Sequence, residues 1–95
     1  MKIHTNGSGG NEIIKFPVQF DLKIIMTTPS NHQDNVDSLE AVLRNLSIDF
    51  ANWRHKISDK GAYTSYTVNV LIISQSILTQ LYADLKNVPG VKLAL

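Results

Sequence analysis

Apolar and polar residues alternate along the segment from Phe16 to Thr28. Every second position from 18 to 26 is apolar, and most of the positions between them are polar: Val18, Phe20, Leu22, Ile24 and Met26 are the apolar ones. A period of two is typical of a strand that is buried on one face only. The pattern therefore predicts a strand over 16–28, in a sheet that other elements cover on one side.

The apolar spacing changes to that of a helix after Pro29, which cannot donate to a strand ladder. Apolar residues then return at intervals of three and four, at Val36, Leu39, Val42, Leu43 and Leu46. Carboxylates occupy the early turns and Arg44 lies near the end, an arrangement that the helix dipole favours. We expect a helix over about 33–47.

A weaker alternation over Trp53–Ile57 and a stronger one from Tyr63 predict two further strands. Tyr66, Val68, Val70 and Ile72 should face one side of the sheet, and Tyr63, Ser65, Thr67, Asn69 and Leu71 the other. The segment between the strands, 58–61, is a turn cluster in which Gly61 tolerates a positive φ. Two strands this close in sequence form a hairpin.

The last part of the chain predicts a second helix and a short final strand. Ser74 or Ser76 caps a helix whose apolar stripe comprises Ile77, Leu78, Leu81, Tyr82, Leu85 and Val88. The Pro89-Gly90 pair ends this helix. Alternation of Val91, Leu93 and Leu95 with Lys92 and Ala94 then indicates a strand.

The predicted order β-α-β-β-α-β is that of a ferredoxin-like α+β fold. Right-handed crossovers place both helices on one face of a four-stranded antiparallel sheet with strand order 4-1-3-2. The other face stays open unless a partner covers it. We expect one such domain over 13–95, preceded by a flexible Gly/Ser-rich tail over 1–12.

Three segments resemble the YbeD-like family of small bacterial proteins. The residues that carry the resemblance are Phe16-Pro17-x-x-Phe20-x-Leu22-Lys23-x-x-Met26, Ser58-x-Lys60-Gly61-x-Tyr63-x-Ser65 and Leu81-Tyr82-x-x-Leu85-x-x-x-Pro89-x-Val91-Lys92-x-x-Leu95. The sequence departs from the family at Ala62, where asparagine is usual. The resemblance implies a ferredoxin-like domain similar to the ACT regulatory domains, with a regulatory or ligand-binding role and no established activity.

Composition narrows the function further. The 95-residue chain has a net charge of +1 and no cysteine, which excludes disulfides, thiolate nucleophiles and cysteine-bound metal clusters. No apolar run approaches the roughly 18 residues of a membrane span, so we expect a cytoplasmic protein. His4, His32 and His55 lack the spacing of metal ligands, and His55 is expected to be a partly covered sheet residue. We therefore expect no metal and no cofactor.

The sequence also lacks the patterns of the enzymes and binding proteins that share this fold. The loop 27–31 has neither the glycine with which ACT domains approach an amino acid nor the cations that an acylphosphatase needs. Neighbouring carboxylates on the first helix are explained by the helix dipole. A stacking platform for RNA needs several aromatic residues on the open face, and only Tyr63 lies there. We therefore do not expect an enzyme.

The open face of the sheet is the candidate functional surface. By alternation it carries Lys23, Arg54, Lys56 and Lys92 against Asp21, a basic balance. We select Lys23, Arg54, Lys56, Tyr63 and Thr67 as the candidate binding residues. The leading hypothesis is a non-catalytic regulatory or binding module that binds a small ligand or a protein, including a second copy of itself. The alternative is a binder of nucleic acid or acidic proteins through this basic face.

Overall fold

The computed structural model describes residues 15–95 as one sheet with two helices. The elements in chain order are β1 (Val18–Thr27), α1 (His32–Asn45), β2 (Asp49–Ile57), β3 (Tyr63–Ile72), α2 (Gln75–Lys86) and β4 (Val91–Ala94). The strand order β2-β3-β1-β4 is the predicted order 4-1-3-2, so the ferredoxin-like fold is confirmed. The predicted tail over 1–12 and the predicted domain start at 13 lie outside the described residues.

The central strands β1 and β3 pair antiparallel without interruption. Their register runs from Val18 opposite Ile72 to Thr27 opposite Tyr63. Residues of even number on both strands face the helices, and most of them are fully buried; those of odd number face away. The alternation in the sequence therefore predicted correctly which side of each central strand is covered.

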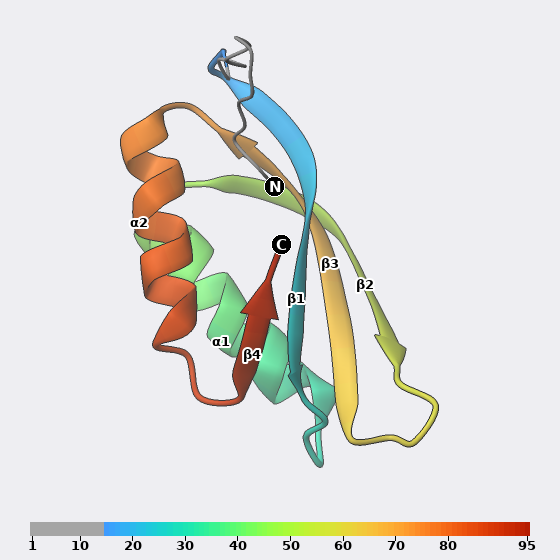
Figure 1. Ribbon diagram of the computed structural model, residues 1–95. Coiled ribbons are helices and arrows are strands. Elements are labelled where there is room, and N and C mark those ends of the chain that lie inside the picture. The colour runs from blue at the N-terminus through green and yellow to red at the C-terminus, as the bar shows by residue number, and fades with distance from the viewer. Residues whose placement is uncertain (1–14) are drawn as a thin grey trace, which may run out of the picture.

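Both helices lie on the same side of the sheet (Figure 1). α1 begins after Asn31, whose side-chain oxygen accepts the Gln33 N–H at 3.0 Å. α2 begins after Ser74, whose Oγ accepts the Ile77 N–H at 3.2 Å, which decides between the two serines considered for this cap. Side-chain caps of this kind satisfy amide groups that the first helical turn leaves unpaired.

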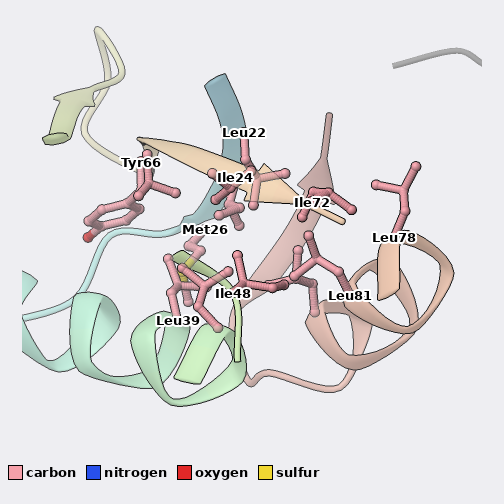
Figure 2. Packing of buried hydrophobic residues seen from close by; sticks show 13 residues of the cluster. Leu22, Ile24, Met26, Leu39, Ile48, Tyr66, Ile72, Leu78 and Leu81 are labelled. Atoms are coloured by element: carbon pink, nitrogen blue, oxygen red, sulfur yellow. The ribbon is translucent and has the colours of Figure 1, made fainter. Parts of the chain in front are cut away.

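The core lies between the sheet and the helices, as Figure 2 shows. Its buried hydrophobic residues are Leu22, Ile24, Met26, Leu39, Leu43, Ile48, Tyr66, Val68, Val70, Ile72, Leu78, Leu81 and Leu85. Phe20, which the alternation places on the covered face of β1, is only partly buried and packs against this cluster. The hairpin turn is also as predicted, because Gly61 has a φ of 79° and donates its N–H to the Ser58 carbonyl.

β2 is longer than predicted and contains a bulge. Ala51 lies opposite Asn69 and Arg54 opposite Thr67, so two residues of β2 face one residue of β3. Asn52, in the bulge, has a φ of 64°. The extra residue changes the alternation and puts Trp53 on the helix side, where its indole N–H donates to Glu40 of α1 at 2.7 Å. Because the alternation breaks here, the sequence indicated only the part of β2 after the bulge.

A second bulge, in β4, overturns the predicted orientation of that strand. Met26 lies opposite Val91 and Ile25 opposite Leu93, so Lys92 is an extra residue without a partner in β1. Leu95 exchanges two backbone hydrogen bonds with Lys23. Leu93 and Leu95 therefore share the open face with Ile25 and Lys23, and the placement of Lys92 in a regular alternation on that face was wrong.

The buried helix positions carry much of the stability. Leu43→Ala or Leu81→Ala should lower the free energy of unfolding by about 2–5 kcal/mol, because each leaves a cavity between helix and sheet. Urea unfolding measures this loss. Leu93→Ala is the control, since the Leu93 side chain is about half exposed and should cost clearly less. A loss below about 1 kcal/mol for both core variants would contradict the assigned packing.

Candidate functional site

The structure brings the five candidate residues together on the open face. Thr67 lies between Lys23 on β1 and Arg54 on β2, since it is the register partner of both. Lys56 lies opposite Ser65, and Tyr63 follows on the same side of β3 near the hairpin. The alternation therefore placed all five residues on the correct face of the sheet.

One half of the open face is a closed polar network, which we call the polar half: Gln19, Asp21, Arg54 and Asn69. Asp21 accepts hydrogen bonds from Asn69 at 3.0 Å and from Arg54 at 3.1 Å. Gln19 in turn donates to the Asn69 side-chain oxygen. The Asn69 hydrogen bond, followed by that of Arg54, lowers the pKa of Asp21 below its ordinary value. The charge of Arg54 is thus already balanced within the chain.

The other half of the open face is apolar, and we call it the apolar half: Ile25, Tyr63, Leu93 and Leu95. Tyr63 is 44% exposed, Leu93 48% and Leu95 47%. The two leucines were not predicted on this face, because nothing in the residue types of 91–95 indicates the bulge in β4. A strand that ends in alternating leucines was instead expected to bury them.

A shallow hollow of about 190 Å³ lies beside the apolar half. Its lining residues come from β1, β2, β3 and the hairpin loop: Ile25, Lys56, Ile57, Ser58, Asp59, Tyr63 and Ser65. The floor is low because Ser65 is small and its hydroxyl donates to the Lys56 carbonyl at 3.5 Å. The hollow can therefore receive an apolar side chain from outside the protein.

Two lysines, Lys23 and Lys56, border the apolar half and form no salt bridge with any of residues 15–95. Among residues 15–95 the salt bridges are Arg44–Glu40 and Arg54–Asp21, and neither Lys23 nor Lys56 takes part in one. Both lysines are exposed and flank the apolar residues on the open face. Their charge is therefore available to a partner, in contrast to that of Arg54.

A second polar cluster lies on the helix side, where α1 begins. The rings of His32 and His55 stack with centroids 4.4 Å apart and planes 16° apart. His32 Nδ1 lies 2.7 Å from the Tyr66 hydroxyl, which also accepts from Asn35 at 3.2 Å. Nearly parallel rings keep their nitrogen lone pairs in separate planes, so the two imidazoles do not converge on one ion. The cluster ties the start of α1 to β2 and β3.

His55 differs from its expected environment. It was expected to be a partly covered sheet residue, and it is exposed, although its ring lies on the helix side against His32.

Burial raises the pKa of the neighbouring Tyr66 above its ordinary value, and burial does the same for Tyr82. Within 15–95 no three histidine or acidic side chains gather as metal ligands. No helix in this part of the chain is long and apolar enough to cross a membrane.

Comparisons with known proteins agree with the fold. The family described as "Protein of unknown function (DUF493)" matches residues 11–95. A UPF0250 protein of Shewanella halifaxensis is 33% identical over 82 residues, which cover 86% of this chain and 90% of that protein.

Two solved structures share the fold. Protein HP0495 from H. pylori has a TM-score of 0.73 at 18% identity and covers 97% of this chain and 96% of its own. The ACT domain from GTP pyrophosphokinase of Chlorobium tepidum has a TM-score of 0.62 at 15% identity, with 83% of this chain and 96% of that domain covered. The chain therefore has an ACT-like arrangement of sheet and helices.

Removing the amide of Asn69 should weaken the polar half measurably. We expect Asn69→Ala to raise the pKa of Asp21 toward that of a free aspartate, because the hydrogen bond that lowers this pKa most is lost. A carbon-detected NMR titration of the Asp21 carboxyl measures this pKa. In the wild type, the stability from ionised Asp21 is present above pH about 4 and is lost as the pH falls through the lowered pKa. An Asp21 pKa that does not change in Asn69→Ala would contradict the network, and Asn45→Ala on α1 is the control.

The Tyr66 hydroxyl should contribute to stability at neutral pH. Tyr66→Phe removes its contacts with His32 and Asn35 and should cost about 1 kcal/mol, whereas Tyr63→Phe on the open face should cost little. The raised pKa means that neutral Tyr66 stabilises the fold below pH about 10, and that this contribution is lost as the pH rises through the raised value. Urea unfolding on both sides of that pH should therefore show a smaller alkaline loss in Tyr66→Phe. An equal loss in both variants and the wild type would refute this role.

Proposed function

The chain belongs to the DUF493 family, which is the YbeD-like family that its sequence resembles. Because that family is described as one of unknown function, we propose a function from the geometry of the open face. The protein is a non-catalytic binding module that docks another protein on the open face of its sheet. The observation that carries this proposal is the apolar half. Its exposed leucines on β4 and Tyr63 on β3 lie on either side of β1, on the face of the sheet that helices α1 and α2 leave uncovered.

Docking on the open face is favoured over a ligand in the loop between β1 and α1. In that loop the Thr28 N–H already donates to the Ala62 carbonyl at 3.0 Å. Thr28 Oγ1 is likewise paired with Thr64 Oγ1 at 2.8 Å. Because these groups are paired within the chain and the loop has no glycine, an amino-acid carboxylate finds few free donors there.

The contacts of three groups with catalytic potential, Asp21, His32 and Glu40, support a binding role as well. Asp21 is held by Asn69 and Arg54, and His32 is held by Tyr66 and the stacked ring of His55. Glu40 accepts from both Trp53 and Arg44. Each of these groups joins neighbouring elements of the fold, and none of them lines the hollow on the open face. Their engagement favours structural roles over acid–base chemistry.

Nucleic-acid binding is the weaker alternative for this face. Of the four cations predicted there, Arg54 is balanced by Asp21, and the bulge in β4 removes Lys92 from the predicted alternation. Tyr63 is the one aromatic residue that the described part of the open face presents. A single ring and two free lysines are a small platform for bases and phosphates.

Site-specific photocrosslinking tests the docking surface. A photoreactive phenylalanine analogue replaces Leu93 on the open face, and in matched controls it replaces Ala41 on α1 or Ala83 on α2, both exposed. We expect a discrete adduct in cells from position 93 and none from the two helix positions. The adduct from an analogue at position 63 should disappear when Leu93→Asp is added. Adducts that form only from the helix positions would refute the proposal.

A further inference from the structure

The hollow and the leucines beside it form one apolar surface. Leu93 is the register partner of Ile25, and Ile25 lines the hollow together with Tyr63 and Ser65. The apolar surface therefore extends from the floor of the hollow across β1 to β4, and no charged residue lies between Ser65, Ile25 and Leu93. An aromatic or aliphatic side chain from a partner would lose its hydration there and contact Ile25 and Tyr63 directly.

The charges around this surface are mainly positive, with two lysines against one carboxylate. Lys23 and Lys56 border it and have no salt-bridge partner among residues 15–95, while Asp59 is the one carboxylate that lines the hollow. The carboxylate of Asp21 is committed to the polar half. A partner therefore gains from negative charge on both sides of its apolar contact.

We propose that the partner binds through an acidic segment that inserts an apolar side chain into the hollow between Ile25, Tyr63 and Lys56. Carboxylates on either side of that side chain pair with Lys56 and Lys23. This inference rests on the proposed function and adds the chemistry of the partner to it. It also assigns separate roles to the two halves of the open face, since the polar half is satisfied within the chain and contributes shape more than binding energy.

The same charges argue against a second copy as the occupant. A symmetric dimer through the open face would bring two surfaces of net positive charge together, because each copy contributes Lys23 and Lys56 against the one carboxylate of Asp59. An acidic segment removes this repulsion and leaves the apolar contact unchanged. The protein should therefore remain a monomer at concentrations at which it binds such a segment.

A library of random dodecapeptides displayed on phage is the probe. Selection against the full chain should enrich peptides in which acidic residues flank one aromatic or aliphatic residue. The affinity of a selected synthetic peptide is then measured by fluorescence anisotropy. Lys56→Glu should weaken binding by roughly tenfold or more, because it replaces attraction by repulsion, and Lys86→Glu on α2 is the control with the same change of charge.

A filled hollow provides a test that does not depend on charge. Ser65→Phe places a ring where the partner's side chain would enter and should also abolish binding, with an amide NMR spectrum that shows a folded chain. Replacing the apolar residue of the peptide by alanine should have the same effect. Enrichment of basic or uncharged peptides, or equal losses in Lys56→Glu and Lys86→Glu, would overturn the inference.

The remaining outcomes separate this inference from the proposed function. Sedimentation that shows a dimer of the full chain, dissociated by Leu93→Asp, would identify a second copy as the occupant and overturn the inference alone. Competition by a single-stranded RNA oligonucleotide for the peptide site would also overturn it. Crosslinks from position 93 to a basic region of a partner would overturn the inference of an acidic segment, but they would support the proposed docking on the open face. Crosslinks from the helices alone would overturn both.

Discussion

The uninterrupted pairing of β1 with β3 is the constraint on which the rest of the structure depends. Along the whole register the residues of even number face the helices and those of odd number face outward. A shift of β1 by one residue against β3 would expose Leu22 and bury Lys23, at a cost far above the stability of a small domain. The buried face therefore fixes the composition of the open face as well.

The outer strands then modify this pattern through one extra residue each. In β2 the bulge at Asn52 turns Trp53 toward α1, where it bonds Glu40, and keeps Arg54 and Lys56 on the open face. In β4 the bulge at Lys92 turns Leu93 and Leu95 outward. Bulges often re-aim side chains at the edge of a sheet. Here they divide the open face into a polar half that is satisfied internally and an apolar half that is not.

The sequence predicted the parts of the fold that depend on long, regular patterns. The alternation in β1 and β3, the apolar stripes of the helices, and the shared face of Lys23, Lys56 and Thr67 follow from periodicity alone. The bulges could not be predicted, since an extra residue shifts the alternation without any change in composition. Contacts between residues far apart in the sequence could not be predicted either, because no local pattern marks them. Examples are the stacked rings of His32 and His55 and the ion pair of Arg54 with Asp21. The most informative part of the candidate site, the outward leucines, depends on one of these bulges.

The orientation of β4 is the central claim, because the two leucines of the apolar half, and with them the apolar border of the hollow, depend on it. Nuclear Overhauser effects from the methyl groups of Leu93 in the isolated protein measure this orientation most directly. The account predicts effects between Leu93 and Ile25 across the β1–β4 pair on the open face, and none to the buried side chains of Leu81 or Leu85 on α2. Strong effects between Leu93 and those α2 leucines would show that β4 faces the core in regular alternation, and would contradict the account.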